Sequence, residues 1–242
     1  MRQANTVSQT TMPVLDLRRM PAGPDAGDAF LGQQLPASHH PQWEFWRASG
    51  RARAGRFASK ARHLVVIMLE GGLTLQDGTA ETRLAAGDSA LIAPDTGFDW
   101  QCDAPALWIV NGYADQTAGT PPAPGISRID RNAAQRPSPS PAQHLLVGPA
   151  PDCTKLELAG AGDGCWGAGL WTATAYERIP IRYGYYEMMH LHAGAVTVFD
   201  ETGATMTFRE GDLFLMPEGV VAGWRSTADV RKLWSIFTPA TT

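Results

Sequence analysis

Hydrophobic residues along this chain occur in short runs separated by glycine, proline and charged residues. The clearest runs are HLVVIML (63–69), SALIA (89–93), ALWIV (106–110), LWTATAY (170–176), DLFLM (212–216) and KLWSIF (232–237). Runs of this length between frequent turn residues are typical of β-strands, and no long segment has the periodicity of an amphipathic helix. The pattern predicts an all-β protein, built as a sandwich or a barrel.

One segment interrupts this pattern. Residues 115–143 contain TPPAPG and QRPSPSPAQ and are rich in Pro, Ser, Ala and Gly, a composition that cannot form the interior of a sheet. The chain has 242 residues, 44% of them hydrophobic, which is enough for two modest cores. We therefore predict an N-terminal arm (1–43), a first domain (44–114), a Pro-rich connector (115–143) and a second domain (144–242).

The two predicted domains contain matching residues in the same order. Gly71 matches Gly194 and Thr74 matches Thr197 at an offset of 123 residues, Gly87-Asp88 matches Gly211-Asp212 and Trp100 matches Trp224 at 124, and Leu107-Trp108 matches Leu233-Trp234 at 126. Offsets that drift by one to three residues are what short loop insertions produce. The sequence therefore predicts one structural unit built twice.

The second half resembles the cupin superfamily over residues 165–238, specifically the subfamily with ethanolamine-utilisation and ureidoglycine-aminohydrolase relatives. Its best motif is Gly211, five residues, Pro217, one residue and Gly219, similar to the second cupin motif up to its His. A weaker copy covers residues 44–113, where GDSALIAP has one extra residue before its proline. The resemblance implies a bicupin, with two tandem jelly-roll (double-stranded β-helix) barrels of which the first is degenerate.

Cupins hold a metal with two His and a Glu from the first motif and a His from the second, a donor set that suits transition metals. Glu187, seven residues before Gly194, resembles the first-motif Glu. No His stands at residues 180–183, where the other first-motif ligands belong, and Ala222 stands where the second-motif His is expected. One ligand of four remains in the second half.

The first half keeps less of the motif. Leu64 or Val65 takes the place of the Glu, and the segment after Pro94 reads DTGFDW, without a His. His63 opens an apolar run and is interpreted as a strand-edge residue. We therefore predict no bound metal and no cofactor.

His190 and His192 form an HxH pattern, but they follow Glu187 instead of preceding it. Along a strand, Glu187, Met189 and Leu191 share one face, and Met188, His190 and His192 share the other. If Glu187 points into the barrel, these histidines point out. We expect a structural or interface role for the pair, with a metal site shared with a partner subunit as the minority alternative.

A carboxylate buried in a barrel needs a partner, because an unpaired buried charge costs several kcal/mol. We hypothesise that Lys232 or Arg231 supplies the positive charge that a metal supplies in related cupins; the alternative is a solvated Glu187 at the barrel mouth. Arg182 is a further candidate partner. The predicted ligand-binding residues are Glu187, Tyr183, Tyr185, Trp171, Trp224, Lys232 and Arg231.

Composition narrows the partners. The net charge is −4 and the 20 Lys and Arg residues are scattered, so nothing indicates a nucleic acid or an anionic membrane surface. Cys102, Cys153 and Cys165 lie far apart without a metal-binding spacing and are interpreted as reduced thiols. No apolar run is long enough for a signal peptide or a membrane span, so we expect a cytoplasmic protein.

Three functions stay open at this point. The first is metal-independent binding of a small polar metabolite in the second barrel. The second is a small-molecule enzyme, either a metal-free isomerase or epimerase that uses Glu187 and a tyrosine, or a degenerate metal-dependent aminohydrolase-like cupin. The third is a non-catalytic dimeric scaffold. The resemblance implies a homodimer, to which the stripe of Met188, His190 and His192 could contribute.

Overall fold

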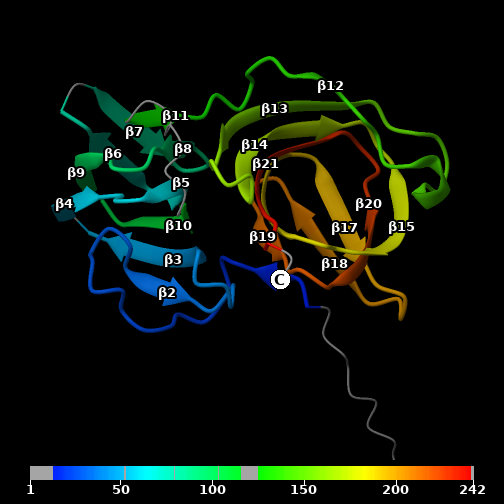
Figure 1. Ribbon diagram of the computed structural model, residues 1–242, viewed down its shortest axis with the longest axis horizontal. Coiled ribbons are helices and arrows are strands. Elements are labelled where there is room, and N and C mark those ends of the chain that lie inside the picture. The colour runs from blue at the N-terminus through cyan, green and yellow to red at the C-terminus, as the bar shows by residue number, and fades with distance from the viewer. Residues whose placement is uncertain (1–12, 52, 79, 103, 116–124, 241–242) are drawn as a thin grey trace, which may run out of the picture.

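A computed structural model of the protein describes residues 13–51, 53–78, 80–102, 104–115 and 125–240 (Figure 1). The first twelve residues of the predicted arm and residues 116–124 of the predicted connector lie outside the described residues. Strand follows strand along the described chain, with one short 3₁₀ turn at Gln143–Leu145. No helix among the described residues has the length and apolar character needed to cross a bilayer.

Two groups of strands follow each other along the chain. The first group consists of β2 (Gln33–Leu35), β3 (Trp43–Gly50), β4 (Arg53–Ala58), β5 (Arg62–Glu70), β6 (Gly72–Gln76), β7 (Glu81–Ala85), β8 (Ser89–Ile92), β9 (Gly97–Cys102), β10 (Ala106–Ala114) and β11 (Ile126–Arg128). The second group consists of β1 from the start of the chain (Leu15–Asp16) together with β12 (Arg136–Ser138), β13 (Cys153–Gly160), β14 (Trp166–Ala173), β15 (Glu177–Arg182), β16 (Tyr186–Ala193), β17 (Ala195–Phe199), β18 (Thr205–Arg209), β19 (Leu213–Met216), β20 (Val221–Arg225) and β21 (Val230–Phe237).

Each group folds into a barrel made of one large and one small antiparallel sheet. The orders are β11-β8-β5-β10-β3-β2 and β4-β9-β6-β7 in the first barrel, and β1-β19-β16-β21-β14-β13-β12 and β15-β20-β17-β18 in the second. The two orders correspond, except that the edge strand β12 of the second barrel has no counterpart in the first. Figure 1 shows the barrels side by side, with the second seen nearly along its axis. The prediction of an all-β protein with two tandem jelly-roll barrels is confirmed.

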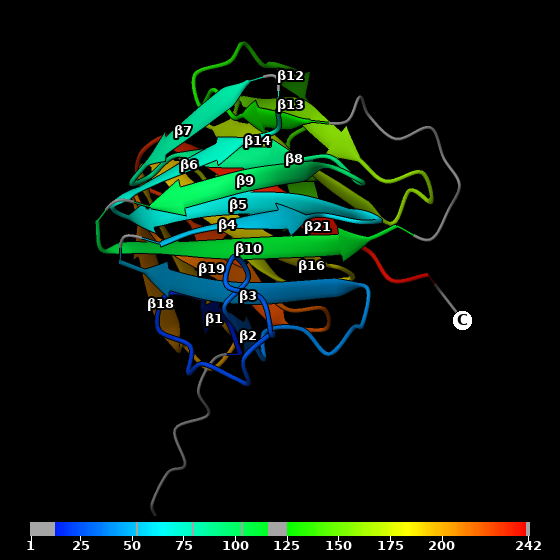
Figure 2. The same cartoon turned by 90° about the vertical axis from the view of Figure 1, so that its left-hand side faces the viewer.

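The two large sheets pack face to face, which explains the uninterrupted apolar runs in the sequence. Strand β5 is buried at seven consecutive positions, because its inner face lines the first barrel and its outer face meets the second barrel. Figure 2 looks through the first barrel toward the second, with β10 and β3 in front of β16 and β21. The small sheets have one solvent face, so a strand such as β9 alternates buried and exposed residues.

Three hydrophobic cores result from this arrangement. One fills the first barrel around Phe30, Trp100 and Trp108. Another lies inside the second barrel around Met189, Phe214 and Trp224. The third joins the barrels, with Trp43, Phe45 and Tyr113 of the first packed against Trp166, Met188 and Phe237 of the second. The fold therefore buries apolar surface between the barrels as well as inside them.

The repeat is confirmed by backbone geometry. Gly71 and Gly194 have φ of 75° and 80°. A Cβ atom added to Gly71 would lie 2.3 Å from the backbone oxygen of Pro105, and one added to Gly194 would lie 2.2 Å from that of Asp229. Only glycine fits such a turn without strain. The chain therefore turns in the same way after β5 in the first barrel and after β16 in the second.

The offset of 126 for the last strand was wrong. In the strand pairing, Trp108 lies opposite Met68 and Lys232 lies opposite Leu191, so Trp108 is equivalent to Lys232 at an offset of 124. Matching Leu107-Trp108 to Leu233-Trp234 slips the register by two residues. Because side chains alternate with a period of two, this slip keeps every residue on its own face and cannot be detected from the hydrophobic pattern.

Segments outside the two predicted domains also form strands, all at sheet edges. β1, from the arm, extends the large sheet of the second barrel, whereas β2 and β11 extend that of the first. The strand β12 contains Pro137, which has no amide hydrogen to donate and suits an edge. The boundaries of the predicted arm and connector stay predictions.

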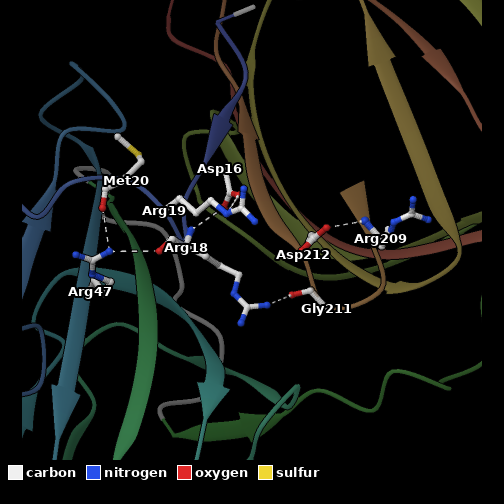
Figure 3. A network of polar contacts seen from close by, with 8 residues as sticks. All are labelled: Asp16, Arg18, Arg19, Met20, Arg47, Arg209, Gly211 and Asp212. Atoms are coloured by element: carbon white, nitrogen blue, oxygen red, sulfur yellow. Dashed lines mark hydrogen bonds and ion pairs between the residues drawn. The ribbon is translucent and has the colours of Figure 1, made fainter. Parts of the chain in front are cut away.

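The arm ties the barrels together between their large sheets (Figure 3). The Arg18 guanidinium donates to the carbonyl of Gly211 in the second barrel, and Arg47 of the first barrel donates to the carbonyls of Arg18 and Met20.

The three cysteines are free thiols, two of them buried.

Candidate functional site

A cavity of about 230 Å³ opens inside the second barrel. Its walls come from the large sheet on one side and from β15, β20 and the turn before β16 on the other. Charged and aromatic side chains alternate around it. The lining residues are Lys155, Trp171, Tyr176, Arg178, Tyr183, Tyr185, Glu187, Trp224, Lys232, Trp234 and Ile236.

The centre of this cavity is an ion pair between neighbouring strands. Lys232 Nζ on β21 lies 2.8 Å from Glu187 Oε1 on β16, and both residues are more than 90% buried. The ammonium also lies 3.1 Å from Met189 Sδ. Charge-assisted hydrogen bonds of this length are strong in a site removed from water. Lys232 therefore neutralises Glu187 within the barrel.

Aromatic rings surround the Lys232 ammonium. Its Nζ lies 4.8 Å from the ring centroid of Trp171 and 5.1 Å from that of Trp224, both within cation–π range. Tyr176 stacks on Trp224 at 6.2 Å with an interplanar angle of 22°. The pair thus sits in an aromatic enclosure that limits access of water to the charges.

Arg178 on β15 is a second buried cation in the same wall. Its Nη2 donates to the Tyr183 hydroxyl at 2.9 Å and, at 3.5 Å, to the carbonyl of Ala222, while its Nε has no hydrogen-bond partner. Burial raises the pKa values of Tyr176, Tyr183 and Tyr185 above their ordinary range, so these hydroxyls are neutral. Among the described residues, no carboxylate pairs with the Arg178 guanidinium.

Six of the seven predicted ligand-binding residues line this one cavity. They are Glu187, Tyr183, Tyr185, Trp171, Trp224 and Lys232. Their role in binding a ligand stays a prediction. Arg231 needs a correction: it is adjacent to Lys232 on β21 and so projects from the opposite face, where its Nη1 donates to Asn132 Oδ1 at 2.9 Å. Arg182 also lies outside, donating to the carbonyl of Gly219.

The predicted set of ligand-binding residues did not include Lys155, Tyr176, Arg178, Trp234 and Ile236, which also line the cavity. Lys155 lies on β13, Arg178 lies on β15, and Tyr176 lies between β14 and β15, all outside the cupin motifs recognised in the sequence. Arg178 lies four residues before Arg182, and the pairing of β15 with β20 shifts register between Arg178 and Ile181, near Pro180. This irregularity turns Arg178 inward while Arg182 stays outside. A proline within a strand was the available signal for it.

The metal that the fold family implies does not fit these residues. Ala222 stands at the second-motif His position with Ile181 opposite it, and Tyr183 is engaged by Arg178. The one carboxylate, Glu187, is already bound to an ammonium. In the part of the chain that the structure describes, no group of three His, Cys, Asp or Glu residues could hold a metal ion. We derive no chemistry through a metal here.

His190 and His192 lie on the outer face of β16, as alternation predicts, in the contact between the barrels. They are 1% and 5% exposed, and their rings meet edge to face at 5.0 Å. Burial, with Arg131 nearby, lowers their pKa values to about 3 and about 4. Because this stripe is buried within the chain itself, with Arg18 and Arg131 near the histidines, the suggestion that it contributes to a dimer face was wrong. The homodimer itself stays a prediction.

Residues 163–234 match the family model of the EutQ-like cupin domain. A search among curated proteins found no match. Among solved structures, a protein of unknown function from Pseudomonas syringae pv. tomato, of the DUF861 family, superposes with a TM-score of 0.78 at 27% identity, covering 89% of this chain and 92% of that one.

Two more distant structures share the fold. A cupin 2 conserved barrel domain protein from Leptotrichia buccalis has a TM-score of 0.63 at 8% identity, covering 93% of this chain and 96% of its own. A salicylate 1,2-dioxygenase from Pseudaminobacter salicylatoxidans has a TM-score of 0.54 at 12% identity, covering 81% and 71%. Residues 163–234 are therefore similar to the EutQ-like cupin domain, and the chain as a whole shares the two-barrel fold of these structures.

Proposed function

We propose that the second barrel binds a small organic anion, a carboxylate, with protein cations in the place of a metal. The observation that carries the proposal is Arg178, which is 9% exposed. Among the described residues, its guanidinium donates hydrogen bonds to a neutral hydroxyl and a carbonyl, and its Nε has no hydrogen-bond partner. A buried charge without a counter-charge is costly, and a ligand carboxylate would remove that cost.

The charges around the cavity support an anion. Lys155, Arg178 and Lys232 line it against one carboxylate, Glu187. Lys232 is paired internally, and Lys155 lies at the rim, with its Nζ 4.4 Å from the ring of Trp234 and 3.7 Å from Glu157. Arg178 is therefore the cation with the most to gain from a ligand.

Size and shape restrict the ligand further. A volume of about 230 Å³ lies below the range of about 300–1,000 Å³ for drug-sized ligands. Trp171, Tyr176 and Trp224 form flat walls around the charged centre. These features favour a carboxylate of a few carbon atoms, held by its charge at Arg178 and by its body against the rings.

Calorimetric titration of the purified full chain with acetate, pyruvate, malonate and crotonate, each beside its neutral amide, tests the proposal. We expect at least one carboxylate to bind and its amide to bind at least tenfold more weakly. Arg178→Met should abolish carboxylate binding. Arg231→Met, which removes a cation from the outer face of β21, should leave it unchanged.

Equal binding of acids and amides, or full binding by Arg178→Met, would overturn the proposal. If Arg178→Met fails to fold, Arg178→Lys keeps a cation and should weaken binding without losing it. Following each bound acid by NMR over hours also tests the isomerase alternative, because turnover would change its spectrum whereas binding would not.

A further inference from the structure

A second cavity lies outside the second barrel, in the contact between the two barrels. Its volume is about 380 Å³, larger than that of the cavity around Glu187. No residue lines both cavities. The walls are β8, the segment around β11, and the outer face of β13 and β14. The residues are His63, Leu91, Ile92, Ala93, Gly125, Ser127, Arg128, Ile129, Asp130, Ala133, Leu158, Ala159 and Trp166.

Most of this lining is apolar, and one side is aromatic. The imidazole of His63 stacks on the indole of Trp166 with centroids 4.9 Å apart and an interplanar angle of 30°. Behind them, Tyr113 lies parallel to the same indole within 3°, with centroids 5.9 Å apart. Leu91, Ile129 and Leu158 supply aliphatic surface. This lining offers an apolar molecule aliphatic and aromatic surface.

Two charged side chains, Arg128 and Asp130, belong to this lining. The Arg128 guanidinium binds Asp88 at 2.8 Å, and the Asp130 carboxylate accepts the amide hydrogen of Asn132. His63 faces Asp115, with Nε2 3.8 Å from Oδ2. Burial lowers the pKa of His63, with Asp115 and Asp163 opposing that shift, so the imidazole is neutral near pH 7. An anionic ligand would therefore find no unpaired cation in this lining, and the Asp130 carboxylate is exposed to water.

Structural ties hold the walls of the cavity in place. Tyr113 donates a short hydrogen bond to Asp163, and the amide of Gly162 donates to Asp115 at 2.8 Å, joining a turn of the second barrel to the end of β10. Trp166 Nε1 donates to Ser235 Oγ at 2.9 Å, which fixes the indole plane. The aromatic wall is therefore preorganised, and a ligand would not have to order it.

We propose that this inter-barrel cavity binds a small uncharged aromatic compound bearing one hydroxyl or ring N–H. The ring lies among Leu91, Ile129, Leu158 and Trp166, and the polar group forms a hydrogen bond with the His63 imidazole. The site differs from the barrel cavity in chemistry as well as in place: one has a surplus of cationic donors, and the other has an apolar wall with one neutral imidazole.

Titration of the full chain with p-cresol and with toluene, followed by calorimetry and ligand-observed NMR, tests this proposal. We expect p-cresol to bind, and toluene to bind several-fold more weakly because it lacks the hydroxyl. Ala133→Phe fills the cavity and should weaken p-cresol at least tenfold. Ala134→Phe, at the exposed neighbour that does not line the cavity, is the matched control and should bind as the wild type does.

His63→Phe keeps the stacked ring but removes the hydrogen bond, so it should make p-cresol and toluene bind equally. Ala159→Leu fills the same cavity from β13 if Ala133→Phe does not fold. Absence of p-cresol binding up to millimolar concentration, or unchanged binding in the folded cavity-filling variant, would overturn the proposal. Loss of binding in Arg178→Met instead would place p-cresol in the second barrel and also overturn it.

Discussion

The two barrels have the same strand order and opposite interiors. Leu64 of the first barrel occupies the position of Glu187 in the second, and Trp108 occupies the position of Lys232. Trp108 is fully buried, and its Nε1 donates to the carbonyl of Phe30 at 2.9 Å. Two exchanges on adjacent strands thus replace an apolar pair with an ion pair.

A third exchange decides where the aromatic bulk lies. Trp171 of the second barrel faces Lys232 across the strand pair, where the first barrel has Ala48 facing Trp108. In the first barrel the indole projects into the centre, and the ring of Phe30 packs on it and on Phe57, Phe98 and Trp100. In the second barrel, indoles form the walls. One fold therefore gives a filled core or a lined cavity, depending on which strand carries the large ring.

The largest effect that follows concerns these two tryptophans. Trp108→Ala should destabilise the protein by about 3–5 kcal/mol, because it leaves a cavity in a filled core and removes the hydrogen-bond donor of the Phe30 carbonyl. Trp171→Ala should cost less than half as much, because this ring already borders a cavity. Urea unfolding of both variants measures the difference. Equal losses would contradict the contrast between a filled and a lined barrel.

The ion pair gives the next effect. Lys232→Met should cost about 3 kcal/mol or more, because it leaves Glu187 buried without its partner. Glu187→Leu combined with Lys232→Met makes this interior resemble the first barrel and should recover the loss, since apolar replacement of a buried ion pair is often neutral. The same urea experiment compares single and double variants. A double variant as unstable as the single one would show that the lost charge pairing was not the cause.

Several features of this arrangement could be predicted from the sequence. Alternation along β16 separated Glu187 from His190 and His192, and matching residues at nearly constant offsets, Gly71 and Gly194 among them, located the repeat. The choice between Arg231 and Lys232 could not be made, because their order along β21 fixes opposite faces without saying which face is inside. Pairing with β16 and β14 supplies that information, and it is a property of the folded sheet.

Other features depend on contacts that no local pattern encodes. Arg178 turns inward at an irregularity between β15 and β20, and the cavity between the barrels exists because two separate sheets pack. The continuous apolar run in β5 predicted a strand, but it did not say that the second barrel covers the outer face of that strand. Sequence periodicity predicts which residues share a face; packing decides what that face meets.

The two faces of β16 give the last predicted effect, which depends on pH. Inside the barrel Glu187 is paired, whereas outside it His190 and His192 are buried with their Nδ1 atoms unpaired. Their folded pKa values of about 3 and about 4 lie below the unfolded value of 6.5, so the unfolded chain binds more protons between these limits. Stability is therefore complete above about pH 6.5 and is lost as the pH falls, by about 1.4 kcal/mol per pH unit for each histidine.

Urea unfolding at about pH 7 and about pH 5 measures this slope. Replacing both buried histidines with leucine should flatten it, leaving the smaller contribution of His63, whose pKa is also lowered by burial. His144→Leu, at an exposed position, should keep the wild-type slope. If the double variant were as sensitive to acid as the wild type, protonation at the contact between the barrels would not limit stability, and the acid sensitivity would have to arise from groups elsewhere in the chain.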